Sequence, residues 1–246
     1  MKILNKVFVC FVGLVLLVQN IFSQELKLAL SLSIPPYVIS KNNSGIELDI
    51  LKEAFALSNI TVKPLYVPLA RLIKQLEFSP VDGSATVLES LGLKNVYFSD
   101  TYITYKNIAV SLKKNHLKIN SIADLNNKDI VTFQNAKMYL GKDFSQVVSG
   151  NINYYEFYDQ EKQVKMLFKN RAEVIVLDRY IFYYYKKNSQ EKYEEEVVIH
   201  DIFPVSKYKI AFKDSKIRDK FNKGLKEIKS NGRYDAIINK YLQWEK

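Results

Sequence analysis

Leucines at every second position from 26 to 32 alternate with other residues, which predicts a first β-strand that Pro35-Pro36 ends. Apolar residues recur at helical spacing after Gly45, and those at 69, 72, 73 and 76 predict a second helix just after Pro68. The further strands predicted in this half lie at 60–67, 81–87 and 105–112. Strands that alternate with helices favour βαβ units, so we expect an α/β fold with mainly parallel sheets.

The second half of the chain repeats this order of elements. Ser121 is expected to cap a short helix, and Asn135 to cap a helix that runs through Lys142. Two helices, over 215–230 and 234–244, follow near the C-terminus. The strands predicted in this half lie at 130–133, 153–157, 174–177, 197–199 and 208–212. The pattern is again that of strands flanked by helices.

Two lobes explain this succession most economically, because no internal repeat or low-complexity linker interrupts it. Residues 24–109 would form the first lobe and residues 110–202 the second. Residues 203–246 would return to the first lobe. We therefore expect each lobe to be a sheet flanked by helices.

Residues 1–23 have the layout of a secretory signal. Lys2 and Lys6 give a basic start, an apolar run of twelve residues follows from Val7 to Val18, and a more polar stretch ends at Ser23. Twelve residues are too few to span a bilayer, so we expect cleavage after Ser23, with a retained anchor as the alternative. The sequence predicts a protein of the periplasm without a lipid anchor.

Composition excludes several kinds of site. Removing the 23 residues, two of them lysines, from a 246-residue chain of net charge +10 leaves 223 residues with charge +8. Cys10 is the only cysteine and lies in the signal, so the mature chain has no disulfide or thiolate site. His116 and His200 lack the partner spacing of metal ligands, and we assign no metal or cofactor. The lysines are scattered, which argues against nucleic-acid binding.

Three short clusters place an aromatic residue or a carboxylate at the end of a predicted strand or the start of a predicted helix. They are Pro35-Pro36-Tyr37, Gly45-Ile46-Glu47-Leu48-Asp49-Ile50, and Val81-Asp82-Gly83 followed by Tyr97-Phe98-Ser99-Asp100-Thr101-Tyr102. Open α/β sheets hold small ligands at such strand ends. The clusters therefore predict a small-molecule binder.

In this order the clusters resemble those of the family 3 extracellular solute-binding proteins, periplasmic receptors for polar amino acids and related solutes. The resemblance covers nearly the whole mature chain and also includes Ile122-Ala123-Asp124-Leu125-Asn126-Asn127-Lys128, Gly224-Leu225, Asn231-Gly232-Arg233-Tyr234 and Lys240-Tyr241-Leu242. It implies the two-lobed type II periplasmic-binding-protein fold. The lobes would close on the ligand about crossovers near 108–112 and 200–204.

The resemblance also implies a function. The chain would be a monomeric, non-catalytic receptor that captures a small polar solute, cationic or zwitterionic, for an inner-membrane ABC permease. Two alternatives stay open. The protein would instead signal its ligand to a partner in trans, or act like the cyclohexadienyl dehydratases of the same family, in which a cleft carboxylate does acid/base chemistry.

Five positions match ligand contacts of the family. Asp178 corresponds to a carboxylate that faces the ligand amino group, with capping of the next helix as its structural alternative. Glu47 corresponds to a second carboxylate. Tyr37 corresponds to an aromatic wall, for which simple packing is the alternative. Thr86 and the residues from Gln134 to Ala136 line the remaining edge, where Asn135 replaces a small or hydroxyl residue.

One family contact has no direct counterpart. Amino-acid-binding members supply an arginine for the ligand α-carboxylate from a Thr-x-x-Arg segment, and here the stretch from Thr86 to Lys94 has no arginine. Lys94 is one replacement, but it lacks the bidentate fork of arginine. We favour Arg71, in the first turn after Pro68, because it can join free N–H groups in holding an anion. A surface pair with Glu77 is the alternative.

Overall fold

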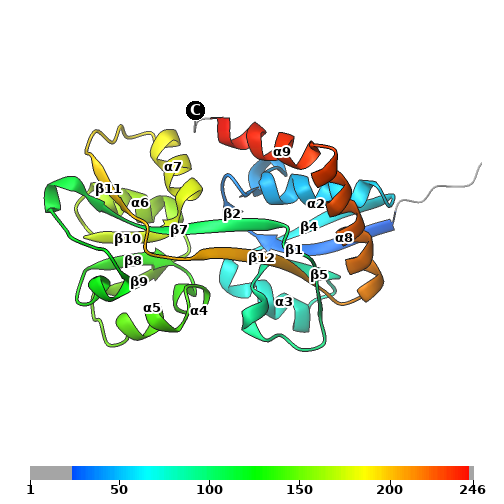
Figure 1. Ribbon diagram of the computed structural model, residues 1–246, viewed down its shortest axis with the longest axis horizontal. Helices are drawn as coiled ribbons and strands as arrows, with labels where there is room; N and C mark the ends of the chain where they lie inside the picture. The colour runs from blue at the N-terminus through cyan, green and yellow to red at the C-terminus, as the bar shows by residue number, and fades with distance from the viewer. Residues whose placement is uncertain (1–23, 244–246) are drawn as a thin grey trace, which may run out of the picture.

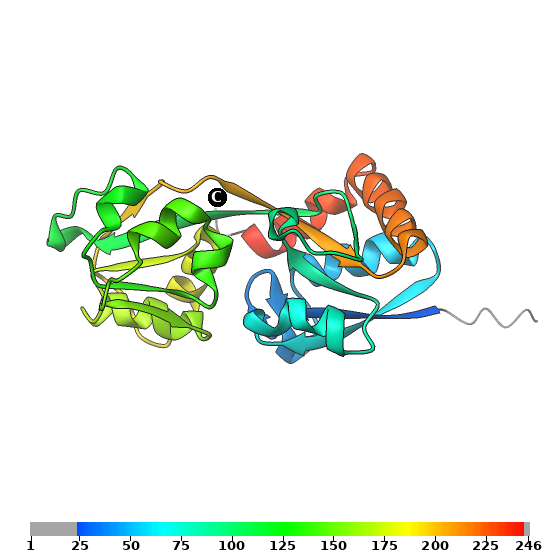
Figure 2. The same ribbon diagram turned by 90° about the horizontal axis from the view of Figure 1, so that it is seen from below.

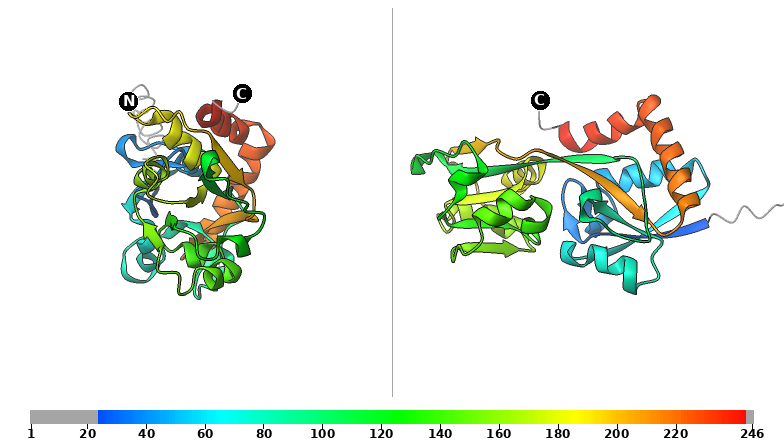
Figure 3. Two further views of the ribbon diagram at one scale, coloured as in Figure 1. Left: turned by 90° about the vertical axis from the view of Figure 1, so that its left-hand side faces the viewer. Right: turned by 60° about the horizontal axis from the view of Figure 1, so that its bottom comes forward.

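The computed structural model describes residues 24–243 and has two lobes joined by two long strands (Figure 1). The predicted secretory signal, with Cys10, lies outside the described residues. Strands β7 (Ile103–Leu112) and β12 (Val205–Phe212) run side by side between the lobes, which lie at either end of them in Figure 2 and in the right-hand view of Figure 3. The predicted two-lobed α/β fold is confirmed. None of the helices within 24–243 combines the length and apolar character that a membrane span requires.

The sheet of the first lobe is built around β1 (Gln24–Ser31). It lies between β4 (Ile60–Val67) and β5 (Gly83–Val87), which are both parallel to it. Beyond β5 the sheet continues with β12, which is antiparallel to β5 and also pairs with the short β6 (Tyr97–Phe98). The alternating leucines of β1 are buried under the flanking helices. These helices are α2 (Ile46–Ala56), α3 (Leu72–Phe78), α8 (Ser215–Ser230) and α9 (Arg233–Leu242).

The sheet of the second lobe is built around β10 (Val174–Asp178). It lies between β8 (Ile130–Phe133), which is parallel to it, and β7, which is antiparallel. Strand β9 (Tyr154–Phe157) extends the parallel part, and β11 (Val197–His200) pairs with β7. All of β10 is buried, as its continuous apolar run predicts for a strand covered on both faces. The helices are α4 (Ala136–Tyr139), α5 (Lys142–Val147), α6 (Gln160–Phe168) and α7 (Arg179–Asn188).

Strand β7 belongs to both lobes. Up to Lys106 it pairs with β12 of the first lobe, and from Asn107 onward it pairs with β10 of the second. This change of partner lies just before the crossover predicted at 108–112. The other connection is the segment 201–204 between β11 and β12, which makes up all but the first residue of the crossover predicted at 200–204. The lobe boundaries at 109/110 and 202/203 stay predictions, because they depend on where the chain bends.

Two helix predictions differ from the structure. After Pro68 a 3-10 turn (Leu69–Arg71) precedes α3, so the α-helix begins three residues later than expected. The prediction that Asn135 caps a helix through Lys142 is wrong. Asn135 has a left-handed backbone (φ 61°), and its side chain makes no capping hydrogen bond, because capping requires an extended residue. A break at Gly141, with φ 92°, then separates α4 from α5.

Helix α8 packs closely against α2 at Gly224. A Cβ atom at this position would lie 2.0 Å from the backbone oxygen of Ala54. Any side chain would therefore push the two helices apart, and glycine allows the backbones to touch. This approach fixes the returning C-terminal segment on the first lobe.

Helix α9 is fastened to the start of α2. Lys240 and the Tyr241 hydroxyl donate to the carboxylate of Asp49 at 2.8 and 2.7 Å, and the Gly45 N–H donates to the Tyr241 hydroxyl at 2.9 Å. The start of α2 carries Glu47, one of the predicted ligand residues. The end of the chain therefore helps to hold that residue in place.

Replacing Gly224 by alanine should destabilise the protein. In an unconstrained helix, alanine in place of glycine increases the free energy of unfolding by about 1 kcal/mol. Forcing extra atoms into a packed interior typically lowers it by about 1–3 kcal/mol. Because the clash is with backbone atoms, which cannot turn aside, the cost should lie in the upper part of that range, about 2–3 kcal/mol. The net loss is then about 1–2 kcal/mol, or roughly 2–8 °C in Tm by thermal unfolding. Lys226→Ala, at an exposed position of the same helix, is the control and should change little. A Gly224→Ala protein as stable as the native one would contradict the close approach.

Candidate functional site

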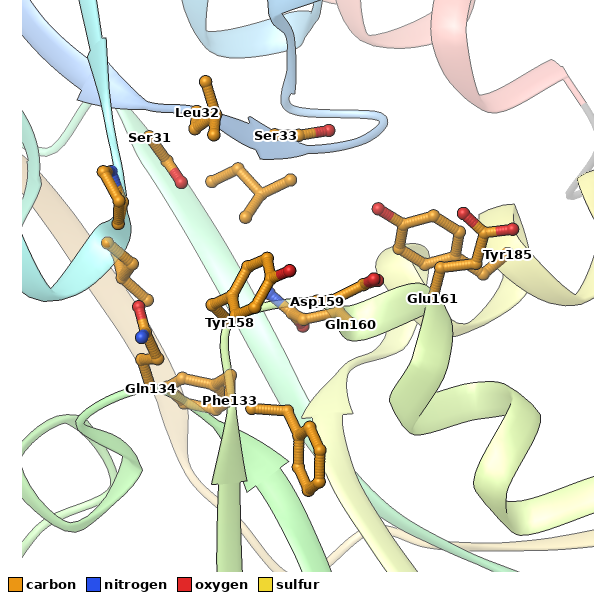
Figure 4. Close-up of a pocket in the computed structure, with 14 residues that line it drawn as sticks. Ser31, Leu32, Ser33, Phe133, Gln134, Tyr158, Asp159, Gln160, Glu161 and Tyr185 are labelled. Carbon is orange, nitrogen blue, oxygen red and sulfur yellow. The ribbon is translucent and has the colours of Figure 1, made fainter.

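A cavity of about 190 Å³ lies between the two lobes (Figure 4). It is lined at the carboxyl ends of β1, β8 and β9 and at the start of α6, where α/β sheets hold ligands. An engineered protein cavity of about 150 Å³ takes up benzene, so this one has room for a small organic molecule. Its lining consists of Ser31, Leu32, Ser33, Ile34, Pro68, Leu69, Phe133, Gln134, Phe157, Tyr158, Asp159, Gln160, Glu161 and Tyr185.

A smaller inner pocket adjoins the cavity. It has a volume of about 20 Å³ and shares Ile34, Leu69, Phe133 and Gln160 with the cavity lining. This volume corresponds to about one water molecule. The bulk of any ligand therefore has to lie in the larger cavity. The other residues of the inner pocket are Thr86, Tyr105, Asn107, Asp178, Ile181 and Tyr208.

Asp178 is the last residue of β10 and the N-cap of α7. Its Oδ1 accepts from the N–H groups of Tyr180 and Ile181 at 2.8 and 3.2 Å. The Lys106 N–H donates to Oδ2 at 2.9 Å, and the Tyr37 hydroxyl donates to Oδ1 at 3.0 Å. Burial raises the pKa of Asp178 to about 6, while these hydrogen bonds favour the charged form. The carboxylate thus has both a capping role and a place at the inner pocket.

Glu47, in the first turn of α2, is fully buried. Thr86 and Tyr102 donate their hydroxyls to Oε2 at 2.8 and 2.5 Å, and the Tyr105 hydroxyl donates to Oε1. Burial raises the pKa of Glu47, and the three hydrogen bonds act in the opposite direction. Glu47 is not among the described residues that line the cavity or the inner pocket. Its hydrogen bonds instead connect α2 to β5 and β7.

Tyr37 connects the lobes. It lies between β2 (Ser33–Ile34) and β3 (Val38–Ile39), and its ring stacks on Tyr105 with centroids 3.9 Å apart. Its hydroxyl reaches Asp178 in the second lobe. Burial and the nearby charge of Asp178 raise the pKa of Tyr37 well above its usual value, so the phenol remains a donor. The hydroxyls of Ser33 and Tyr185, from different lobes, also interact at the cavity wall.

The structure brings four of the six predicted ligand residues together. Tyr37 is hydrogen-bonded to Asp178, and Thr86 is hydrogen-bonded to Glu47. Tyr105 connects the two pairs, because it stacks on Tyr37 and donates a hydrogen bond to Glu47. Thr86 and Asp178 also line the inner pocket. Contact between these four residues and a ligand stays a prediction.

The other predicted residues lie apart from this cluster. Arg71 and Lys94 are exposed, and neither is among the described residues that line the cavity or the inner pocket. The half-buried Asn135 donates its backbone N–H to Glu156 at 2.7 Å and is likewise outside both linings, whereas its neighbour Gln134 lines the cavity. Among the described residues that line the cavity and the inner pocket, none is a basic residue that could take the place of the family's arginine.

Several cavity residues were missed by the sequence analysis. Gln160 and Glu161 begin α6 directly after the loop that follows β9. The carboxyl ends of neighbouring parallel strands meet at one edge of a sheet, where ligands are held. The position of Gln160 and Glu161 shortly after the predicted strand at 153–157 could therefore have indicated that they lie near the ligand. Ser33 and Tyr185 face each other from different lobes, and no local pattern reveals such a pair.

The cavity has acidic and aromatic walls. Asp159 caps α6 by accepting from the Lys162 N–H at 3.2 Å, and Glu161 is exposed. Among the described lining residues these two are acidic and none is lysine, arginine or histidine. The aromatic lining residues are Phe133, Phe157, Tyr158 and Tyr185. This arrangement suits a neutral or positively charged solute.

The sequence matches the bacterial extracellular solute-binding proteins, family 3, over residues 26–243. The chain belongs to this family. The predicted resemblance is therefore confirmed. Members of this family bind small molecules such as amino acids. No match was found among curated proteins.

Solved structures show the same fold. The arginine-, lysine-, histidine-binding protein ArtJ of Geobacillus stearothermophilus has a TM-score of 0.73 and 17% identity, over 89% of this chain and 96% of that one. A histidine kinase sensor domain similar to periplasmic binding proteins has a TM-score of 0.75 and 13% identity, over 89% and 96%. The ancestral amino acid-binding protein AncCDT-1, a precursor of cyclohexadienyl dehydratase, has a TM-score of 0.69 and 23% identity, over 88% of this chain and 95% of that one.

Asp178 should give the stability of the protein a distinct pH dependence. Because its pKa is raised in the folded state, its contribution to stability is complete below about pH 4 and is lost as the pH rises through about 6. Relative to Asp178→Asn, the native protein should lose up to about 3 kcal/mol over this range. Denaturant unfolding of both proteins between pH 4 and 7 measures the difference, in which other titrating groups cancel. Parallel curves would contradict the raised pKa.

Removing the Tyr37 hydroxyl should favour the open arrangement of the lobes. A hydrogen bond to a charged group contributes about 1.5–3 kcal/mol, and this one spans the two lobes. We expect Tyr37→Phe to increase the ligand-free radius of gyration in small-angle X-ray scattering. Tyr105→Phe also removes a hydroxyl from a buried carboxylate, but within the first lobe, and serves as the control. Equal radii for both variants and the native protein would show that the bond does not hold the lobes together.

Proposed function

We propose that this protein is a periplasmic receptor that closes two lobes around a small polar solute, cationic or zwitterionic, for uptake by an inner-membrane ABC importer. The observation that carries the proposal is the cavity of about 190 Å³ to which both lobes contribute walls. Membership of the solute-binding family supports capture of a small molecule. The secretory signal expected over 1–23 supports the periplasm as its location.

Closure of the lobes supplies the binding mechanism. Strands β7 and β12 and the segment before β12 connect the lobes, and bending there would open and close the cavity. A ligand favours the closed arrangement by the contacts that it makes only when both walls are present. In this chain the Tyr37–Asp178 hydrogen bond also crosses between the lobes. The ligand therefore adds to contacts that the protein already makes with itself.

Signalling and catalysis are the alternative functions. The fold is shared with a sensor domain and with a dehydratase precursor. Asp178, a buried carboxyl group at the inner pocket with a pKa near 6, is the residue that would serve as acid or base in a dehydratase. Formation of product from prephenate-like or arogenate-like substrates would favour the enzyme. Neighbouring permease and ATPase genes would favour import over signalling.

Ligand-induced thermal stabilisation tests the receptor function. The mature chain, residues 24–246, is screened against a library of amino acids, amines and other polar solutes. A ligand at one hundred times its Kd should add about 2.7 kcal/mol, which raises Tm by roughly 5–10 °C. A library without any stabilising solute would contradict the proposal.

A cavity-filling variant locates the binding. Ser33 lines the cavity at an exposed position, so Ser33→Trp should fill it without disturbing the core and abolish the stabilisation. Ser90→Trp makes the same change at an exposed position outside the described cavity lining and should retain it. Stabilisation that survives Ser33→Trp would place the ligand elsewhere.

A further inference from the structure

Lys106 lies where strand β7 passes from one lobe to the other. It pairs with Val205, the first residue of β12, and the next residue, Asn107, pairs with Asp178 of β10. The other connection, residues 201–204, lies beside this point (Figure 2). A rotation of the lobes has to be absorbed by the backbone of these two connections. A side-chain contact between them therefore depends on the angle between the lobes.

The ammonium group of Lys106 contacts the other connection twice. Its Nζ lies 2.6 Å from Oδ1 of Asp201 and donates to the backbone oxygen of Phe203 at 2.7 Å. Arg179, the first residue of α7, lies 3.5 Å from Oδ2 of Asp201. The carboxylate of Asp201 thus lies between a cation of the connecting strand and a cation of the second lobe.

Both groups that the ammonium contacts are fixed to the second lobe. Asp201 directly follows His200, the last residue of β11, which pairs with β7 inside that lobe. The ring of Phe203 is 3% exposed and packs against that of Phe144 in α5, with centroids 5.8 Å apart. The segment as far as Phe203 should therefore move with the second lobe, while Lys106 stays paired with β12 of the first.

These contacts favour the closed arrangement over an open one. Opening changes the backbone torsions at 106–107 and 203–205, which moves the ammonium away from the carboxylate and the carbonyl. The side chains of Lys106 and Asp201 are 31% and 50% exposed, so dissolved ions screen their attraction. The preference for the closed arrangement should therefore fall as the salt concentration rises.

We propose that the Lys106–Asp201 salt bridge holds the lobes closed in the absence of ligand and makes their opening salt-dependent. This inference rests on the lobe closure of the proposed function and specifies how it is regulated. Neither residue is among the described residues that line the cavity, so the regulation acts from outside the binding site. It also differs from the Tyr37–Asp178 bond, which is buried and therefore little affected by salt.

Lys106→Met tests the salt bridge. The variant keeps most of the side-chain length and the backbone hydrogen bond to Asp178, but it lacks the charge. The loss should shift the ratio of open to closed molecules about twofold to tenfold. Small-angle X-ray scattering of residues 24–246 without ligand measures the radius of gyration at about 0.1 and 1 M salt, where the Debye length falls from about 10 to 3 Å. We expect Lys106→Met to be larger than the native protein at low salt, and the two radii to converge at high salt.

Two further variants show whether the charge at this place is responsible. Lys106→Arg retains a cation that can reach the carboxylate and should restore the native radius. Lys63→Met removes an ion pair with Glu25 that lies within the first lobe, at 3.1 Å, and should keep the native radius. The same measurements in a Tyr37→Phe background, which lacks one contact between the lobes, reveal the shift if the native protein is almost entirely closed.

Three results would overturn the proposal. They are a radius unchanged by Lys106→Met in both backgrounds, an expansion that Lys106→Arg does not reverse, and an equal expansion in Lys63→Met. If thermal unfolding shows that Lys106→Met does not fold, Asp201→Asn removes the same ion pair from the other side and decides the question.

The outcomes separate this inference from the proposed function. The radii are measured without ligand, so the salt bridge can prove irrelevant while a solute still stabilises the protein. A library without any stabilising solute would instead overturn the receptor function and leave the salt dependence of the lobes unchanged.

Discussion

The carboxylate of Asp178 is the interaction on which the arrangement of this protein depends. A charged group in an apolar interior is strongly unfavourable unless its oxygens are hydrogen-bonded. Here the donors come from the first turn of α7, from Lys106 at the point where β7 changes its pairing partner, and from Tyr37 in the opposite lobe. One group thereby fixes the start of a helix, the position of the connecting strand and the contact between lobes.

Glu47 plays a comparable part inside the first lobe. Its three hydroxyl donors come from β5, from the loop before β7 and from β7 itself, so the start of α2 is held against the strands that line the inner pocket. Because Tyr105 both donates to Glu47 and stacks on Tyr37, the two carboxylates are coupled through one aromatic pair. The acidic residues that a sequence comparison would assign to the ligand thus already have partners within the protein.

Much of the fold could be predicted from the sequence because its signals are local. The strands at 60–67 and 130–133 and the helix at 215–230 have the predicted bounds, since apolar periodicity and flanking prolines and caps determine them. Asp178 was identifiable as an acidic residue that ends a buried strand. The exposed position of Arg71 could not be predicted, because the sequence pattern indicates the helix but not the direction of the side chain. The hydroxyl network around Glu47 joins residues 39 to 58 positions apart, which no local pattern reveals.

The contact between Gly224 and Ala54 also constrains the order in which the chain can assemble. The second lobe is made from one uninterrupted stretch, so all of its strands are available before the last part of the chain exists. The first lobe must wait, since β12 and α8 complete its sheet and cover α2. Domains fold as units when their residues are present. During synthesis the second lobe can therefore form early, while the first lobe, which needs β12 and α8, forms later.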